Sequence, residues 1–192
     1  MTALTPTPQS TAAVSNRPSL ASQLVGVWVL VSYTNQQPDH KDTYPFGPCP
    51  QGFLIYTSEG FVSAQLMKPG RPAFRSADWH HATPEEYQNS GSGYIAYCGI
   101  YEVDEEKGSV THTPSVSLLP NLIDGHHIRL IDLHGDFLTL RTIGTAVPNG
   151  LSVTNRLEWK RAIPDVAVPI QSSRSFSIQE SAHASHPTHR LR

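Results

Sequence analysis

Residues 24–33 read Leu-Val-Gly-Val-Trp-Val-Leu-Val-Ser-Tyr, an apolar run with a Gly-x-Trp near its start. Valine recurs at every second position, at 25, 27, 29 and 31. Because β-branched side chains lose rotamer freedom in a helix but fit a pleated strand, the stretch predicts a β-strand. A Gly-x-Trp at this place is typical of the first strand of a small β-barrel that encloses a ligand, so we expect a binding cavity.

Composition narrows the class of protein. The chain has 192 residues, 38% of them hydrophobic, and a net charge of -2, which suits one domain with one core. Without a basic surplus, nucleic acid is not an expected partner. Because residues 1–22 lack the features of a secretory signal and no apolar stretch reaches membrane-spanning length, we expect a soluble cytoplasmic protein with no membrane partner. Cys49 and Cys98 are expected as free thiols, although the sequence does not decide their pairing.

The two ends of the chain differ from its middle. Residues 1–21 and 163–192 are rich in Ser, Thr and Pro and lack apolar periodicity, so we expect disordered tails on either side of one domain at 22–162. The second tail carries His183, His186 and His189, but a tail without fixed geometry is a poor metal cage. We expect no metal site and no cofactor, because metal-ligand spacings and nucleotide-binding glycine loops are missing.

The middle of the chain predicts an all-β fold with eight strands. Turn residues such as Ser58-Glu59-Gly60 separate apolar runs that form successive hairpins. After the opening strand, the expected strands are 52–57, 61–67, 93–104, 109–118, 126–133, 137–142 and 153–161. One short helix is predicted at 82–87, where Thr83 can cap it and Pro84 suits its first turn. Residues 68–92, which include this helix, are a candidate lid.

Several of these segments together resemble the lipocalin-like domain family of bacteria and fungi. The resemblance spans roughly residues 22–161 and rests on the motifs at 26–32, 52–57, 62–67, 93–104 and 135–140. It implies an eight-stranded antiparallel lipocalin-like barrel. It does not imply a single activity, because such barrels include both carriers and enzymes. Some fungal members act as cyclases or isomerases in natural-product pathways, which keeps a catalytic hypothesis open by analogy.

His112 is the first candidate catalytic residue. In the strand at 109–118, alternation puts His112 on the apolar face with Val110, Pro114, Val116 and Leu118. An imidazole among inward apolar side chains needs a hydrogen-bond partner or has a lowered pKa, and a neutral one can act as a base or a donor. The alternative is a core histidine whose hydrogen bonds are satisfied within the protein.

Tyr97 and Tyr101 are the second and third candidates. In the strand at 93–104, Glu102 and Asp104 mark the wet face, so both tyrosines are expected to line the interior. If this strand pairs with the next one, either tyrosine can approach His112 and form an acid/base pair that acts on a carbonyl compound. The alternative is that each hydroxyl bonds to a backbone group.

A further group of residues is expected to bind the ligand. Arg129 would anchor an oxyanion if it faced inward, but both faces of its strand mix apolar and polar residues, so its orientation stays open. In the lid, Trp79 is expected to cap the barrel mouth, and His80 or His81 to offer a proton donor there. We also expect Trp28 and Tyr56 to contact the ligand.

Two functions follow from these residues. The first is a cofactor-free enzyme that binds a hydrophobic polyketide or terpenoid intermediate and catalyses its cyclisation, isomerisation or dehydration, with His112, Tyr97 and Tyr101 as acid/base groups. The second is a non-catalytic carrier of a hydrophobic small molecule. A barrel filled by its own side chains ranks last. The sequence does not indicate the substrate or the oligomeric state.

Overall fold

The computed structural model describes residues 18–37, 40–76, 78–143, 145–146 and 152–163. The chain divides into two units, residues 1–162 and 163–192, and the elements of regular structure all lie in the first. The predicted disordered tails therefore lie largely outside the described residues. The elements are α1 (Leu20–Leu24), β1 (Gly26–Gln37), β2 (His40–Thr43), β3 (Gln51–Tyr56), β4 (Phe61–Met67), η1 (Trp79–His81), α2 (Pro84–Ser92), β5 (Tyr94–Asp104), β6 (Ser109–Ser117), η2 (Pro120–Leu122), β7 (His127–His134), β8 (Phe137–Thr142), β9 (Thr145–Ala146) and β10 (Ser152–Arg161).

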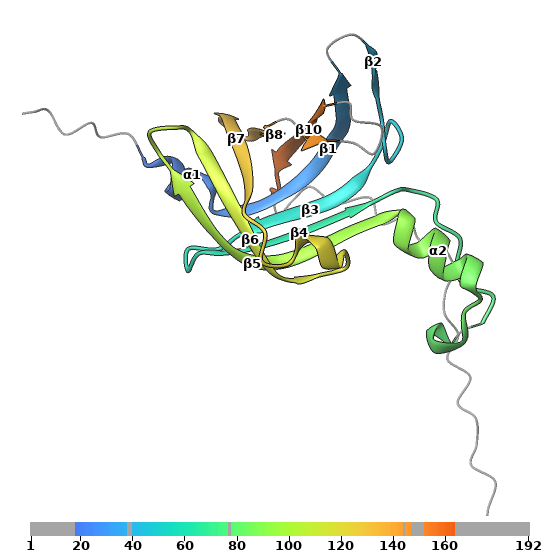
Figure 1. Cartoon of the computed structure of the whole chain (residues 1–192). Helices are drawn as coiled ribbons and strands as arrows, with labels where there is room; N and C mark the ends of the chain where they lie inside the picture. The colour runs from blue at the N-terminus through green and yellow to red at the C-terminus, as the bar shows by residue number, and fades with distance from the viewer. Residues whose placement is uncertain (1–17, 38–39, 77, 144, 147–151, 164–192) are drawn as a thin grey trace, which may run out of the picture. The chain divides into compact units, whose positions relative to one another are not determined.

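The strands form a closed antiparallel barrel (Figure 1). Its strand order is β1-β3-β4-β5-β6-β7-β8-β10, and β10 pairs again with β1. The predicted eight-stranded barrel is confirmed. The short strands β2 and β9, which the sequence analysis did not predict, extend this sheet beside β1 and β10. No helix in the described part of the chain is long and apolar enough to cross a membrane.

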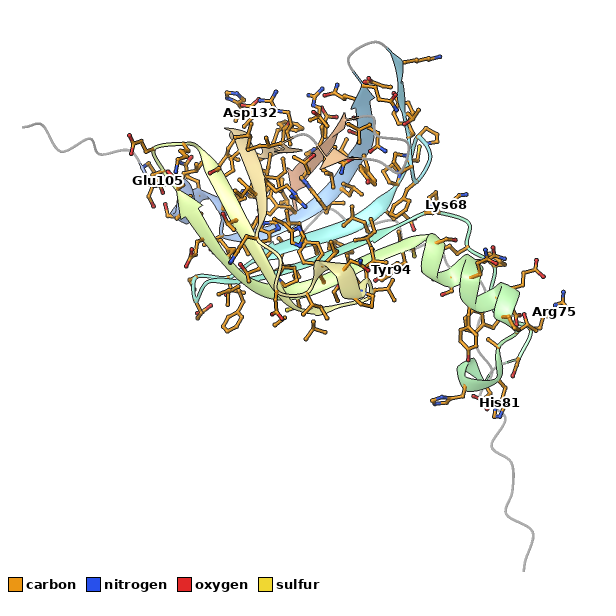
Figure 2. The ribbon with its side chains drawn as sticks, viewed as in Figure 1. Lys68, Arg75, His81, Tyr94, Glu105 and Asp132 are labelled. Carbon is orange, nitrogen blue, oxygen red and sulfur yellow. The ribbon has the colours of Figure 1, made fainter. Side chains whose placement is uncertain are left out.

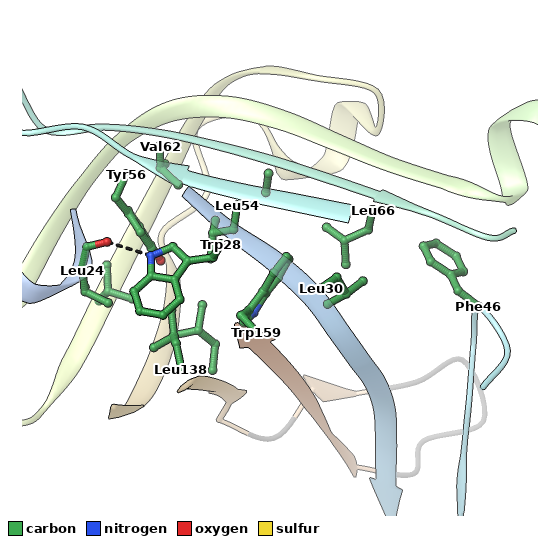
Figure 3. Close-up of a cluster of buried hydrophobic side chains, with 13 residues drawn as sticks. Leu24, Trp28, Leu30, Phe46, Leu54, Tyr56, Val62, Leu66, Leu138 and Trp159 are labelled. Carbon is green, nitrogen blue, oxygen red and sulfur yellow. Dashed lines mark hydrogen bonds between the residues drawn. The ribbon is translucent and has the colours of Figure 1, made fainter. Parts of the chain in front are cut away.

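One end of the barrel is tightly packed, and we call it the closed end; it is formed by Leu24, Trp28, Leu138 and Trp159 (Figure 3). Trp28 is 0% exposed, and its indole Nε1 donates a hydrogen bond to the carbonyl oxygen of Leu24 at 2.8 Å. The guanidinium of Arg161 lies 4.1 Å from the centre of the Trp28 ring, a cation-π distance. The Gly-x-Trp motif thus builds a packed closure at this end.

Helix α1 begins inside the segment that was expected to be disordered. Ser19 caps it, and the carboxylate of Glu105 accepts hydrogen bonds from the amides of Leu20 and Ala21 at 2.8 and 2.9 Å. Figure 2 shows Glu105 at the end of β5 beside this helix. A carboxylate at a helix N-terminus is favourable because free N–H groups point toward it. Regular structure therefore starts at Leu20 rather than after residue 21.

His112 on β6 faces the interior as predicted, but the residues at the end of the predicted strand do not. Val116 and Leu118 are 68% and 45% exposed, so the expectation that they point inward is wrong. The register between β5 and β6 shifts at Cys98 and Gly99, and a β-bulge of this kind reverses the alternation beyond it. Gly99 permits the close approach, since a Cβ there would lie 2.1 Å from the carbonyl oxygen of Thr113.

Residues 68–92 form a separate arm between β4 and β5. The predicted helix is present as α2, and Thr83 forms a full capping box with Glu86. Its contacts are with the preceding loop, including a hydrogen bond of 2.7 Å from Arg71 to the hydroxyl of Ser90. Figure 2 shows Arg75 and His81 far along this arm from Tyr94. That the arm acts as a lid stays a prediction.

Candidate functional site

His112 forms the centre of a hydrogen-bonded group inside the barrel. It is 1% exposed, and its Nε2 lies 2.7 Å from the hydroxyl of Tyr56 on β3. Its Nδ1 lies 2.8 Å from the hydroxyl of Tyr97 on β5. We call these three residues the triad. It joins three strands, β3, β5 and β6, across the interior.

All three members of the triad are neutral near pH 7. Burial, together with the nearby Arg129 and His127, lowers the pKa of His112 to about 3, and burial is the largest of these causes. Burial raises the pKa of the Tyr97 hydroxyl, and it raises that of Tyr56 well above the usual range. Since no member changes charge near pH 7, the triad provides hydrogen bonds rather than ready proton transfer.

The direction of these hydrogen bonds can be assigned. In the described part of the chain, the fully buried Tyr56 hydroxyl has no partner except His112, so its hydrogen must point to Nε2. A neutral imidazole carries one N–H, so Nδ1 is the donor and the Tyr97 oxygen accepts from it. The Tyr97 O–H is then left to donate to another group. The triad thus offers one free donor, carried by Tyr97.

Arg129, whose orientation the sequence left open, faces the interior. It pairs in register with Val110 on β6 and with Thr142 on β8, and both of these are buried. Its charge is close enough to lower the pKa of Tyr33, Tyr56 and Tyr97 relative to burial alone. Among the described residues, no carboxylate lies within ion-pair distance of Arg129, and its one hydrogen bond is to the neighbouring Ile128 carbonyl.

Polar side chains continue from Arg129 around the barrel. The Thr142 hydroxyl accepts a hydrogen bond from the amide of Asn155 on β10, which pairs with Asn35 on β1. The Asn35 side-chain oxygen is buried and has no donor among the described residues. The sequence analysis missed Thr142, Asn155 and Asn35. The alternation of inward residues on β8, Leu138 and Leu140, predicts Thr142 as the next inward residue. Asn35 could not be predicted in this way, because a bulge between Leu30 and Ser32 shifts the alternation of β1.

These polar residues lie in a part of the interior that we call the open half. It is lined by Tyr33, Asn35, Tyr97, Arg129, Ile131, Asn155 and Leu157. They point inward yet all stay partly exposed, in contrast to the closed end. Tyr97 and Arg129 are therefore inward residues that keep some solvent exposure, which makes them the candidates for contact with a bound molecule.

The remaining predicted site residues lie elsewhere. The hydroxyl of Tyr101 donates to the carbonyl oxygen of Thr57 at 2.9 Å, so Tyr101 is not the partner of His112 although it is opposite it in register. Trp28 is buried in the closed end, with its N–H already bonded, which gives it a packing role. His80 is exposed in η1, and the side chain of Trp79 lies outside the described residues. No group of three His, Cys, Asp or Glu side chains in the described segments is arranged to hold a metal ion.

Comparisons with known proteins agree with this architecture. The model of the lipocalin-like domain family matches residues 25–162. A protein of Aspergillus oryzae, named as a 4'-hydroxy-3'-methoxypropiophenone carrier protein, is 29% identical over 106 residues. The match covers 52% of this chain and 96% of that protein. Because the family model spans most of the chain and the barrel described above, the chain belongs to the lipocalin-like domain family.

Proposed function

We propose that this protein is a carrier that binds a small aromatic ketone in the open half of its barrel. The observation that carries the proposal is the Tyr97 hydroxyl, an inward donor held in place by neutral His112 and left without an acceptor among the described residues. A ligand carbonyl or phenolic oxygen supplies the acceptor. The apolar side chains of Tyr33, Ile131 and Leu157 provide contact surface for an aromatic ring.

The Aspergillus oryzae relative supports this ligand class. Its name states that it carries an aromatic ketone with a hydroxyl and a methoxy group on the ring. Such a compound combines an apolar ring with three kinds of oxygen acceptor, in its carbonyl, hydroxyl and methoxy groups. It fits an interior with few polar groups among apolar side chains. We therefore place the proposed role in secondary metabolism, as a carrier of such an intermediate.

The chemistry of the triad favours a carrier over an acid/base enzyme. An efficient general base has a pKa near the working pH, whereas the pKa of His112 is lowered to about 3. The imidazole is also enclosed by Tyr56 and Tyr97, so it does not meet the ligand directly. These features suit recognition of an oxygen atom and make His112 a positioning residue for Tyr97.

Cofactor-free catalysis is the second candidate. The Tyr97 hydroxyl and the Arg129 charge are directed into the same interior, an arrangement that stabilises an enolate when a carbonyl compound loses a neighbouring proton. An isomerisation, cyclisation or dehydration would use this stabilisation. In this case Tyr97 would contact the reacting oxygen and His112 would orient it.

One experiment separates the two candidates. The purified protein is mixed with 4'-hydroxy-3'-methoxypropiophenone, binding is measured by calorimetry, and the same sample is analysed by mass spectrometry. We expect saturable binding of an unchanged compound and about 10-fold weaker binding for Tyr97→Phe, because one hydrogen bond is lost. Tyr101→Phe is the matched control and should bind like the wild type. Absence of binding by the wild type would refute the carrier, and conversion that Tyr97→Phe abolishes would establish the enzyme.

A further inference from the structure

We propose that the barrel binds its ligand as an oxyanion, specifically as the phenolate of an acyl phenol, and that Arg129 supplies the balancing charge. This inference rests on the proposed function and deepens it, because it assigns the ionisation state of the ligand and the residue that selects it. An acyl phenol is suited to this role because its carbonyl group spreads the phenolate charge through the ring.

The first argument is the charge balance of the interior. The described titratable groups that face it are Tyr33 on β1, Tyr56 on β3, Tyr97 and Tyr101 on β5, His112 on β6, and His127 and Arg129 on β7. The described inward residues of β4 and β8 carry no ionisable group, and on β10 Arg161 lies over the Trp28 ring at the closed end. Burial raises the pKa of the four tyrosines, so among the described residues the interior holds cations and no anion. An environment of low dielectric with one sign of charge favours a ligand of the opposite sign.

A second observation is that Arg129 has no counter-ion among the described residues. Two arginines of β10 are paired, Arg156 with Glu158 at 2.7 Å and Arg161 with Asp136 at 3.5 Å. In the described part of the chain Arg129 bonds to the carbonyl of Ile128, which uses one of its five N–H donors. A half-buried guanidinium without a carboxylate is stabilised further when an anionic oxygen arrives, because charge-assisted hydrogen bonds are the strong ones.

The third argument is the hydrogen-bond polarity of the site. The assigned triad turns the Tyr97 O–H toward the interior as a donor, and Arg129 also only donates. A phenolate oxygen accepts from both, whereas a neutral phenol would bring a hydrogen that neither group accepts well. On binding, the O–H bond of the ligand breaks and the proton leaves to solvent, since His112 is too weak a base to hold it.

The test compares 4-hydroxyacetophenone with 4-methoxyacetophenone, which has nearly the same shape but cannot ionise. Affinity is measured by calorimetry, and ionisation is followed by the long-wavelength absorption of the phenolate. At a pH where the free phenol is mostly protonated, we expect the bound phenol to show the phenolate band. We also expect the phenol to bind at least about 10-fold more tightly than its methyl ether.

Three variants locate the effect. Arg129→Gln should lower the affinity for the phenol about 10- to 100-fold and abolish the phenolate band, while the affinity for the ether changes little. Arg129→Lys keeps the charge and should keep part of the preference. Arg141→Gln is the matched control, because Arg141 lies on β8 beside Thr142 but is exposed on the outer face. Circular dichroism confirms that each variant is folded.

The outcomes distinguish this inference from the carrier proposal. Equal affinity for phenol and ether, or equal effects of Arg129→Gln and Arg141→Gln, would overturn the inference and leave the carrier standing. If the wild type bound neither compound, both would be refuted. Binding of the phenol with its band, lost only in Arg129→Gln, would support both.

Discussion

The two halves of the barrel interior are built from different residues. At the closed end, Trp28 and Leu138 are fully buried, and the indole N–H of Trp28 is bonded to Leu24. In the open half, Tyr97 and Arg129 point inward but stay partly exposed, and each keeps at least one N–H or O–H without an acceptor in the described part of the chain. We infer that the closed end serves stability and that the open half serves the proposed binding of a ligand. Substitutions at the closed end should cost stability, and those in the open half should cost affinity.

The triad lies between these two regions and belongs partly to each. Tyr56 is part of the packed core, whereas Tyr97 borders the open half, and His112 connects them. The hydrogen bond between buried Tyr56 and His112 fixes the tautomer of the imidazole. This tautomer determines that the Tyr97 hydroxyl accepts from Nδ1 and donates toward the interior. The core therefore orients the donor that we propose for the ligand.

The largest expected effect is at the closed end. Trp28→Ala removes a fully buried ring, its hydrogen bond to Leu24 and the surface on which Arg161 stacks. We expect the free energy of unfolding to fall by about 3–5 kcal/mol, measured by urea denaturation. Val31→Ala, at a half-exposed outer position of β1, should change it by less than about 1 kcal/mol. Similar losses in the two variants would contradict a packed closure around Trp28.

The next effect is the pH dependence that comes from His112. Its pKa is about 3 in the folded protein against 6.5 when unperturbed, so between these values the unfolded state binds more protons. Stability from this group is therefore complete above about pH 6.5 and is lost as the pH falls toward about 3, by up to about 5 kcal/mol. Urea denaturation of the wild type and of His112→Gln between about pH 3 and 6.5 isolates the contribution of His112 to the free energy of unfolding. Parallel curves would show that His112 is not buried as a neutral group.

A smaller loss of stability is expected when Tyr56, the buried tyrosine of the triad, is substituted. Tyr56→Phe leaves Nε2 of His112 without a donor, so we expect a loss of about 1–3 kcal/mol in the free energy of unfolding. Its effect on affinity should be modest, because Tyr56 does not border the open half. A variant with wild-type stability would mean that water replaces the hydroxyl at Nε2.

The smallest effect is expected for Tyr101→Phe. Its hydroxyl bonds only to the carbonyl oxygen of Thr57 near the β3–β4 turn, which is close to solvent. We expect a loss of about 0.5–1.5 kcal/mol and no change in ligand affinity. A clear drop in affinity, measured by calorimetry, would show that Tyr101 contacts the ligand and would contradict the proposed division between the closed end and the open half.

Much of the site could be predicted from strand alternation, and its exceptions have physical causes. The period of two correctly placed His112 and Tyr97 on the interior. Pairing of adjacent strands allowed either Tyr97 or Tyr101 to approach His112, and Tyr97 does so, whereas Tyr56 bonds to Nε2 from β3, a contact that a strand pattern cannot reveal. The inward direction of Arg129 depends on the register of β7 between β6 and β8, since both faces of its sequence look alike.

Local patterns also miss features that depend on distant contacts. Helix α1 has only five residues and depends on Glu105, which bonds to the amide of Leu20 from 85 positions away in sequence. The outward direction of Val116 depends on the bulge opposite Gly99, a feature of two strands rather than one. Fold class and strand order are encoded locally, whereas caps and bulges arise from the assembled sheet.

The most direct test of the division between the halves is an NMR titration of the labelled protein with 4-hydroxyacetophenone. We predict that the side-chain signals of Tyr33, Tyr97 and Leu157 shift and saturate together, while the indole N–H of Trp28 stays in place. Shifts confined to the pocket beside α2 lined by Arg71, Phe74 and Ser90, or to the outer face of the barrel, would contradict the account.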